Sequence, residues 1–352
     1  MTILSRLNPL LAPFLSRLVV PGAPEIEILQ PEETEAVKAP VFLNGMLDRI
    51  TGTDEHSVLA DHLQAASALT VTHAPVIRYT YRNALVRRSG FATARYSEKY
   101  SRGRDLAELV GPVVRLPHLR HCNNYVTWRY FGHWLVDGIP TAMIDPDDGP
   151  LWMPPHPDWA KWGHARDYQA ALELPIVAAP VVHAESLSVY QDFGQGSHNA
   201  CRYATIRNRL QARFGNGSAD GYVYLRRGST GVLRSIVNEE PFVDALVARD
   251  WTILDIASAS MAEIQQAVCR AKVVMSIDGS QLCHAHLALL PRSVMVNLLP
   301  QDRFTSHLLG PCRAHAITPA IVVLQGSQDK GYQVDLEEAL RTVDLAVAAS
   351  DA

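Results

Sequence analysis

Four short apolar runs decide the fold of this chain: YVYLRR (222–227), WTILDI (251–256), KVVMSI (272–277) and SVMVNLLP (293–300). The segments between them have helical features. A capping box at Ser260 and Glu263 begins the second of three predicted helices, and the turn DGSQ (278–281) leads into the third. Strand and helix therefore alternate with short connections. This pattern predicts a parallel sheet that is covered by helices.

The carboxyl ends of these strands carry the residues that are best suited to hold a ligand. In such sheets ligands bind at that edge. Arg226 and Arg227 end the first run, and Arg234 follows in a loop rich in Gly, Ser and Thr before the next helix. Guanidinium groups and the free amides at a helix start both bind phosphate oxygens. No Walker motif and no GxGxxG occurs, and at this point solvated arginines on an exposed loop are an equally good interpretation.

The turn DGSQ adds a second feature at the same edge. Gly279 permits close approach of the backbone to a ligand, and Ser280 can cap the helix that follows. His284 lies on the first turns of this helix. His286 stands two residues further on, so the two imidazoles diverge on a helix and a metal-binding pair is not expected.

A second constellation lies in NNYVTWRYFGHWLVDGIP (123–140). His133 and Asp137 are four residues apart, so on a helix they share one face. A carboxylate beside an imidazole favours the imidazolium and fixes the orientation of the ring, as a general base requires. The helix is expected to end or kink before Pro140. The plainer alternative is a histidine on a core helix with an unrelated surface carboxylate.

Composition limits the class of protein. The chain has 352 residues, enough for two domains, and its 47% apolar and 19% charged residues are typical of a globular protein with a full core. The net charge of −4 provides no general basic field for nucleic acid. Five cysteines, without a CxxC pair, suit a reducing compartment. Other histidines, at 118 and 121 or at 156 and 164, lack partners at metal-ligand spacing.

The first 20 residues are apolar but are interrupted by Asn8, Pro9, Pro13 and Arg17. They make a poor signal peptide, and no run in the chain approaches the 18 apolar residues of a transmembrane helix. We expect a docked helix or a loose terminus here, and a peripheral membrane contact is the alternative.

Taken together, HWLVDGIP (133–140), YLRRGSTGVLRSIVNEE (224–240) and DGSQLCHAHLALLP (278–291) resemble the family 61 glycosyltransferases, often described as capsular or exopolysaccharide biosynthesis proteins. The resemblance covers roughly 123–140 and 222–300, in the order and spacing of the family. This chain departs from the family pattern in one turn. Asp278 stands where the family usually has His, Ser280 and Gln281 replace small residues, and His284 replaces Asn.

The resemblance implies an α/β fold of the GT-B type, with two Rossmann-like domains whose parallel sheets face an inter-domain cleft. The loops and predicted elements along the chain divide it into a leader and connection (1–40), a first α/β domain (41–200), a second α/β domain (201–330) and a C-terminal helix (331–352), with the main boundary between about 190 and 215. The resemblance makes the first the acceptor-side domain and the second the nucleotide-sugar domain. It also implies inverting transfer of a hexosyl or pentosyl group from a nucleotide sugar to a glycan or lipid-linked acceptor, without a cofactor and usually without a metal ion.

The resemblance also assigns roles to residues. His133 and Asp137 match the catalytic helix on the acceptor side. The donor-binding positions are Arg226, Arg227, Arg234, Asn238, Glu239, Gly279, Ser280, Gln281 and His284. The expected setting is surface polysaccharide synthesis in the cytoplasm or at the inner face of the membrane. Two alternatives remain at this point: an inactive nucleotide-sugar-binding subunit, and a phosphate-ester or metal-dependent hydrolase that uses the His/Asp pair.

Overall fold

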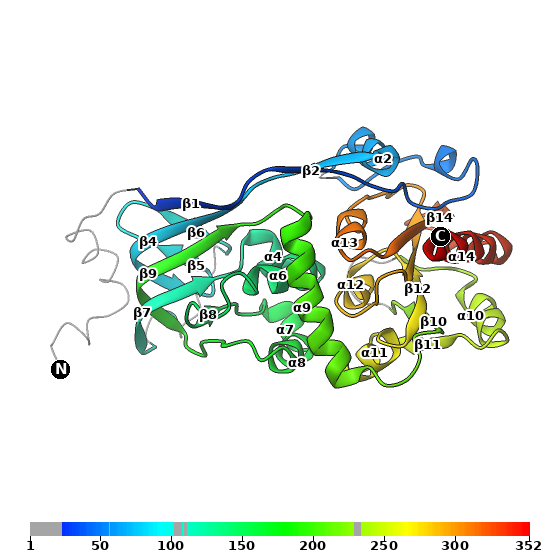
Figure 1. Cartoon of the computed structure of the whole chain (residues 1–352). Coiled ribbons are helices and arrows are strands. Elements are labelled where there is room, and N and C mark those ends of the chain that lie inside the picture. The colour runs from blue at the N-terminus through cyan, green and yellow to red at the C-terminus, as the bar shows by residue number, and fades with distance from the viewer. Residues whose placement is uncertain (1–22, 56, 102–107, 109–110, 229–233) are drawn as a thin grey trace. The chain divides into compact units, whose positions relative to one another are not determined.

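The computed structural model describes residues 23–55, 57–101, 108, 111–228 and 234–352 (Figure 1). The predicted membrane contact at 1–20 lies outside the described residues. The chain divides into two compact units, which we call unit 1 (Met1–Glu33 and His73–Gly194) and unit 2 (Thr34–Thr72 and Gln195–Ala352). The second crossing from unit 1 to unit 2, at 194/195, falls inside the predicted boundary interval.

Unit 2 is built on a six-stranded sheet with the order β11-β10-β12-β13-β14-β15. Its strands are β10 (Gly221–Arg226), β11 (Thr252–Asp255), β12 (Ala271–Ile277), β13 (Val294–Pro300), β14 (Thr318–Ser327) and β15 (Gly331–Gln333). The first five are parallel to their neighbours, and β15 adds an antiparallel edge. Its helices are α9 (Ser197–Phe214), α10 (Glu239–Val247), α11 (Met261–Val268), α12 (Ser280–His286), α13 (Leu309–Ala314) and α14 (Leu336–Asp351).

The parallel sheet predicted from the four apolar runs is therefore confirmed. Strands β12 and β13 are buried along almost their whole length, because helices cover both faces of the sheet. Figure 1 shows α11, α12 and α13 on one face and α10 and α14 on the other. The predicted capping box is also present, since the Ser260 hydroxyl accepts from the Glu263 amide while the Glu263 carboxylate accepts from the Ser260 amide.

The strand order of unit 2 identifies where a ligand belongs. Numbered from β10 to β14, the parallel strands follow the order 2-1-3-4-5, which is the flavodoxin-like form of the doubly wound sheet. In this order the chain runs from β10 toward one edge of the sheet, to β11, and from β12 toward the other edge, to β13. The strands β10 and β12 therefore flank the topological switch point. Ligands of doubly wound sheets bind at the carboxyl ends of the two strands that flank this point. Those ends are Arg226 and Ile277.

The segment 34–72 packs on unit 2. Met46 is fully buried in the core of this unit, Val41 forms a parallel bridge with Ala320, and Arg49 makes a bidentate ion pair with Glu338 of α14. The short elements of the segment are β2 (Glu33–Ala36), the 3-10 turn η2 (Leu47–Arg49), α2 (Leu59–Ser67) and β3 (Thr70–His73), with β2 and β3 forming a two-stranded sheet. The predicted N-terminal domain of 41–200 differs from this division, because the order of the chain does not reveal that residues 41–72 return to the later sheet.

Unit 1 has a seven-stranded sheet with the order β6-β5-β4-β9-β7-β8, and β1 also pairs with β4. Its strands are β1 (Glu25–Gln30), β4 (Val76–Arg87), β5 (Gly90–Ala92), β6 (Ser97–Lys99), β7 (Val113–His121), β8 (Leu151–Trp152) and β9 (Val181–Gln191). Only β7 runs parallel to its neighbours β9 and β8. The other pairs are antiparallel.

The prediction of a Rossmann-like, parallel first domain is therefore wrong. Strands β4 and β5 are joined by a turn of two residues, which permits only an antiparallel pair, whereas parallel neighbours need a long crossover. Alternating apolar residues identified these strands, but such a pattern does not fix their direction. The helices of unit 1 are α4 (Tyr125–Arg129), α5 (Phe131–His133), the π-turn η3 (Trp134–Gly138), α6 (Ile139–Ala142), α7 (Pro157–Ala160) and α8 (His164–Ala171).

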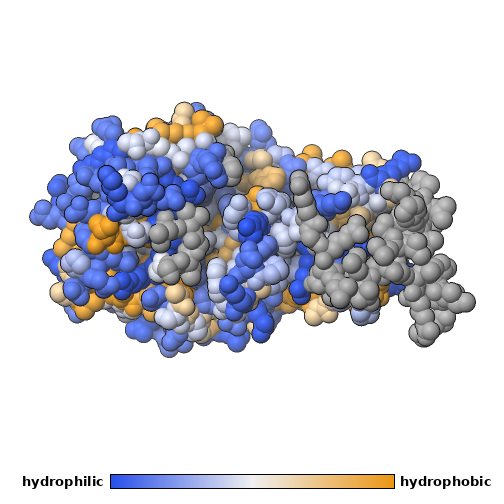
Figure 2. Space-filling view, turned by 180° about the vertical axis from the view of Figure 1, so that it is seen from behind, coloured by the Kyte–Doolittle hydropathy of each residue, from blue (hydrophilic) through white to orange (hydrophobic). Residues whose placement is uncertain are grey.

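Among the described residues, no helix is both long enough and apolar enough to cross a membrane. The face drawn in Figure 2 is mostly hydrophilic, with apolar residues gathered in small separate patches.

Candidate functional site

Two partly buried arginines meet the turn after β12 at the switch point of unit 2. Nη1 of Arg227 lies 3.1 Å from the Asp278 carbonyl oxygen and 3.1 Å from Oε1 of Gln281. Nη1 of Arg234 lies 2.9 Å from the Asp278 carboxylate, and these two side chains are only 9% and 10% exposed. Residues from two separate parts of the chain thus form one polar cluster at the expected ligand edge.

The electrostatics of this cluster are positive on balance. Burial lowers the pKa of Arg227 from its ordinary 12.5 to about 10, and the nearby charges of Arg234 and Arg303 lower the pKa further, against the raising effect of Asp278. Two guanidinium groups therefore contact the turn at Asp278, and a third, that of Arg303, is near enough to act on the charge of Arg227. Arg227 still carries its charge at neutral pH, but its own surroundings do not fully compensate that charge. An anionic ligand would supply the missing compensation.

Gly279 makes the close packing of the cluster possible. Its φ of +151° lies in a region that side chains with a Cβ rarely adopt. A Cβ at this position would also overlap the guanidinium of Arg227 and crowd the amide of Gln281. Any larger residue at 279 must therefore displace Arg227. The glycine at 279 is therefore needed for Arg227 to reach the turn 278–281.

Asp278 and Asn297 complete the cluster, and Asn297 was not predicted. Nδ2 of Asn297 lies 3.3 Å from Oδ1 of Asp278, and the Asn297 side chain is buried on β13. The signal was its position as the one polar residue in the apolar run SVMVNLLP after its first serine. Arg303 also escaped prediction, because it stands alone in a loop. The Nε groups of Arg234 and Arg303 and Oδ1 of Asn297 are buried without a hydrogen-bond partner among the described residues.

The helix α12 places the other predicted residues of the turn. Ser280 is exposed at its first position, while Gln281 and His284 are buried. The Gln281 amide donates to Oγ of Ser276 at 3.0 Å, and its oxygen accepts from Arg227. The backbone oxygen of His284 accepts from Nε2 of Gln265 at 3.1 Å. Gln281 therefore orients Arg227, and His284 is part of the packing between α12 and α11.

The remaining donor-side residues make structural contacts instead of joining the cluster. Arg226 pairs with Glu239 at 3.1 Å and with Glu240, and the Tyr224 hydroxyl donates to Glu239 at 2.8 Å. Asn238 donates to the Val334 carbonyl at 2.8 Å and accepts from the Val334 amide at 3.1 Å. Asn238 is the N-cap residue of α10, but its side chain makes no capping bond.

In unit 1 the predicted His/Asp pair is formed. Nδ1 of His133 lies 2.7 Å from Oδ2 of Asp137, and both side chains are partly exposed, at 37% and 27%. With the carboxylate at Nδ1, the neutral ring carries its proton there and its lone pair on Nε2. The arrangement can therefore accept a proton at Nε2, and Asp137 can stabilise the imidazolium that results.

Local structure explains how the pair is presented. A capping box between Asn124 and Thr127 begins α4, and Trp134 is fully buried, where it stacks on Phe131. The chain then widens into the π-turn η3 and continues through Pro140 into α6. Of the predicted end or kink before Pro140, the end does not occur, but the π-turn interrupts the regular helix just before the residue that has no amide proton to donate. Single π-turns of this kind are frequent at functional sites.

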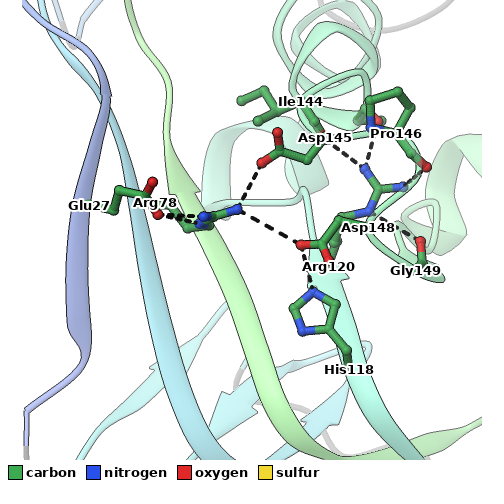
Figure 3. A network of polar contacts seen from close by, with 10 residues as sticks. Glu27, Arg78, His118, Arg120, Ile144, Asp145, Pro146, Asp148 and Gly149 are labelled. Carbon is green, nitrogen blue, oxygen red and sulfur yellow. Dashed lines mark hydrogen bonds and ion pairs between the residues drawn. The ribbon is translucent and has the colours of Figure 1, made fainter.

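The far end of this helical segment is fixed by Arg120 of β7. The buried Arg120 guanidinium donates to four carbonyl oxygens of the turn that follows α6 (Figure 3): Ala142 at 3.1 Å, Ile144 at 2.8 Å, Pro146 at 3.3 Å and Gly149 at 3.2 Å. Arg78 of β4 holds the same turn, since it pairs with Asp145 at 2.9 Å. These contacts anchor the segment that carries His133 and Asp137 to the sheet.

Two kinds of chemistry are thus available, one in each unit. Unit 2 offers fixed positive charge at a ligand-binding edge, and unit 1 offers an oriented imidazole. One further group of possible metal ligands occurs among the described residues, formed by Asp54, His62 and His307.

Comparison with known proteins gives one family. The model of Glycosyltransferase 61 matches residues 131–296. No curated protein matches the chain. Twenty solved chains match, among them the flavodiiron protein from Giardia intestinalis, which is 8% identical with a TM-score of 0.26. That match covers 55% of this chain and 47% of the other, so this chain spans about half the length of that protein. At such a TM-score the likeness says nothing about function.

The family match covers the helix with His133 and Asp137 as well as the strands that lead to Arg227 and Asp278. The resemblance to the glycosyltransferase 61 family that the sequence indicated is therefore confirmed over residues 131–296.

Proposed function

We propose that this chain is an inverting glycosyltransferase that moves a hexosyl or pentosyl group from a nucleoside diphosphate sugar to a hydroxyl group of a glycan or lipid-linked acceptor. One observation carries the proposal: Arg227 and Arg234 meet at Asp278 and Gly279, at the switch point of a doubly wound sheet, with the charge of Arg303 acting on Arg227. Glycosyl transfer from such a donor leaves a diphosphate, and that leaving group needs positive charge around it.

The arginines would bind and stabilise the departing diphosphate. Guanidinium groups in a partly desolvated place act on developing negative charge more strongly than they would in water, and they need no reorganisation during the reaction. The free backbone amides at the start of α12, beside Gly279 and Ser280, would add hydrogen-bond donors for the same phosphate oxygens. With three guanidinium groups in place, we expect donor binding to be independent of added Mg²⁺ or Mn²⁺.

The His/Asp pair would activate the acceptor. Nε2 of His133 would remove the proton of the acceptor hydroxyl as its oxygen attacks the anomeric carbon and the bond to the diphosphate breaks. Asp137, 2.7 Å from Nδ1, would hold the ring and stabilise the imidazolium. Attack from the side opposite the leaving group gives inversion. The donor would thus bind to unit 2 and the acceptor to unit 1, the division of labour of GT-B enzymes.

The wider setting that we propose is the synthesis of a surface polysaccharide from the nucleotide sugars of the cytoplasm. The high apolar content of residues 1–20 supports a peripheral contact with the membrane where lipid-linked acceptors are found. No partner nucleic acid is proposed.

Calorimetric titration with a panel of nucleoside diphosphates tests the donor side. Arg227→Ala or Arg234→Ala should weaken binding about ten- to a hundred-fold, because each removes a charge-assisted contact worth about 1.5–3 kcal/mol. Arg249→Ala is the control, since Arg249 is exposed on the solvent side of unit 2 and donates to its own helix. Arg226→Ala should have a smaller effect than Arg227→Ala. Normal binding by both the 227 and 234 variants would contradict the donor assignment.

Sugar-transfer rates test the acceptor side. Asp137→Asn and His133→Gln should leave diphosphate binding intact while transfer falls by roughly 10²–10⁴, the usual contribution of a positioned general base. Asp147→Asn, an exposed acid of unit 1, is the control. Tight diphosphate binding by a wild-type protein that transfers no sugar would instead favour the inactive binding subunit. Hydrolysis of a phosphate ester that stops in both variants would favour the hydrolase.

A further inference from the structure

Three metal-binding side chains come together in unit 2 from distant parts of the sequence. Asp54 precedes α2, His62 lies within α2, and His307 lies in the loop between β13 and α13. Each offers one ligand atom, and the three atoms lie within 4.8 Å of one another. A gap of more than 240 residues separates His62 from the loop of His307, which is why spacing in the sequence could not reveal the group.

His62 supplies a second, independent observation. Its side chain belongs to a residue that is only 8% exposed, and its Nε2 atom is buried without a hydrogen-bond partner among the described residues. Buried polar nitrogen atoms are normally paired, and leaving one unpaired costs about 1–3 kcal/mol. A metal ion on Nε2 would remove this cost.

The other ring nitrogen of His62 is already held. Nδ1 lies 2.9 Å from Oγ of Ser306 and 3.2 Å from the Ser306 amide nitrogen. Without a metal ion the amide donates to Nδ1, and the proton of the ring is on Nε2. When Nε2 binds a metal ion, the ring proton moves to Nδ1, where the Ser306 hydroxyl can accept it, and the Ser306 amide must give up its hydrogen bond to Nδ1. Partners of this kind fix the orientation of metal-bound histidines.

The backbone around the group is fixed in advance. The segment before Asp54 and the loop before His307 are joined by hydrogen bonds from Thr51 to Gln301 at 2.7 Å, from Phe304 to Gly52 at 2.9 Å and from the Thr53 hydroxyl to Phe304 at 2.8 Å. The Asp54 carboxylate also accepts from the Ser57 hydroxyl at 3.0 Å. The ligands therefore do not have to be collected from a mobile chain, which lowers the cost of binding.

We propose that Asp54, His62 and His307 bind one divalent transition-metal ion, with Zn²⁺ the best fit and water completing the tetrahedron. Two imidazoles and one carboxylate suit Zn²⁺ and disfavour Mg²⁺ and Ca²⁺, which prefer oxygen ligands throughout. Ligands about 2.0–2.1 Å from zinc stand about 3.4 Å from one another in a tetrahedron. His307 is exposed, so a rotation of its side chain can close the remaining gap.

The bound ion would cross-link two segments of unit 2. It would join the segment 34–72, which contains α2, to the loop after β13. That loop also carries Arg303, whose charge acts on Arg227. This inference does not rest on glycosyl transfer, because binding of the metal depends only on the three ligands and their supports. The ion would not contact the leaving group, so the proposal of a metal-free transfer step is unaffected.

Binding of Zn²⁺ alone tests the proposal. The whole chain is freed of metal with a chelator, dialysed, and titrated with Zn²⁺ in competition with a chromogenic chelator. We expect one zinc per chain in the wild type and at least about 100-fold weaker binding in His307→Gln and Asp54→Asn, because outer partners alone change affinity about 10- to 100-fold. His198→Gln and Asp61→Asn, partly or fully exposed residues of unit 2 outside the group, should bind as the wild type does.

Two further measurements keep the result interpretable. Zn²⁺ should raise the thermal unfolding midpoint of the wild type and both controls but not of the two ligand variants, whose circular dichroism shows whether they are folded. Co²⁺ should give the visible absorption of a tetrahedral site without a thiolate charge-transfer band. Failure of the wild type to bind one zinc, or equal affinity in ligand and control variants, would mean adventitious binding and would overturn the proposal.

Discussion

The polar cluster of Arg227, Arg234 and Asp278 depends on the single residue Gly279. The guanidinium of Arg227 occupies the space that a Cβ at 279 would need, and the backbone there has a φ of +151°. The conformation is strained for any residue other than glycine, at a cost of about 1–3 kcal/mol. The glycine of this family-type turn is therefore required by the arginine that packs on it as well as by the backbone itself.

Gly279→Ala should consequently behave like a loss of Arg227. We expect diphosphate affinity to fall about ten-fold or more, because the guanidinium is displaced, together with a loss of about 1–3 kcal/mol in the free energy of unfolding. Titration calorimetry and denaturant unfolding measure the two effects. Gly310→Ala is the matched control, because its Cβ would meet only the flexible side chain of Gln195. Equal diphosphate affinity in both variants would show that Arg227 tolerates displacement.

His286 links stability to pH. It is fully buried on α12, and burial lowers its pKa from the ordinary 6.5 to about 3. Below pH 6.5 the unfolded chain takes up a proton that the folded chain refuses, so stability that is present at neutral pH is lost as the pH falls from 6.5 toward 3. This one residue should make the protein about 2 kcal/mol less stable at pH 5 than at pH 7.

The contribution of His286 can be separated by substitution. His286→Met replaces the titrating imidazole in the core by an apolar side chain of comparable length. The loss of unfolding free energy between pH 7 and pH 5 should therefore shrink by about 2 kcal/mol. Denaturant unfolding of both proteins at the two pH values measures it. An unchanged difference would assign the pH dependence to other buried histidines, such as His121, whose pKa burial lowers to about 4.

Residue by residue, the sequence predicted which segments of unit 2 meet, but not which side chains of each segment take part. Arg227, Arg234 and Gly279 come together as expected, because strand ends on either side of a switch point must meet. Arg226 and Asn238 belong to the same motif but face glutamates and the Val334 backbone. Neighbouring residues at the end of a strand point in opposite directions, and a motif alone does not tell which of them reaches the ligand.

At the scale of elements, Arg120 supports the helical segment that carries His133 and Asp137. It is fully buried, and four carbonyl oxygens after α6 depend on it for hydrogen bonds. Backbone carbonyls that lose such a partner in a buried place cost about 1–3 kcal/mol each. Nothing in the sequence identified Arg120 as structural, because its partners are backbone atoms, which leave no pattern of residue types.

Arg120→Met should therefore lower the unfolding free energy by about 3 kcal/mol or more and reduce sugar transfer without changing diphosphate affinity. The reduction in transfer follows from the loss of the anchor behind His133 and Asp137. Denaturant unfolding, transfer rates and calorimetry check the three parts. Arg82→Met, which replaces an exposed arginine on β4 of the same sheet, is the control. A variant that transfers sugar at the wild-type rate would show that the helix segment is held elsewhere.

At the scale of the whole molecule, the two sheets differ in how much the sequence disclosed. Unit 2 could be predicted because its parallel strands are buried on both faces and its helices lie between them in sequence. Unit 1 could not, because strand direction depends on pairing across long distances, such as β4 with β9. The segment 34–72 gave no signal of its destination, since its contacts with the later part of unit 2 join residues more than 240 positions apart.

The discontinuous composition of unit 2 leads to the last prediction. An isolated chain of residues 195–352 lacks Met46, which is fully buried in its core, and leaves Glu338 without Arg49. Truncating one buried methionine side chain costs about 2–5 kcal/mol, and losing the whole segment costs more, against a total stability of about 5–15 kcal/mol for a domain. We expect this fragment to be largely unfolded by circular dichroism.

Residues 34–72 joined to 195–352 by a short Gly/Ser linker should instead fold. The join is feasible because the chain ends nearly meet: a Cβ on Gly194 would lie 2.7 Å from the Ala74 carbonyl oxygen and 3.4 Å from Cβ of His73. This joined fragment contains the whole arginine cluster, so it should bind nucleoside diphosphate with an affinity close to that of the full chain and transfer no sugar, because His133 and Asp137 are missing. Calorimetry and transfer assays measure both properties. Folding of 195–352 alone with the same stability would show that the segment 34–72 is dispensable, and loss of diphosphate binding by a folded joined fragment would show that the donor needs residues of unit 1.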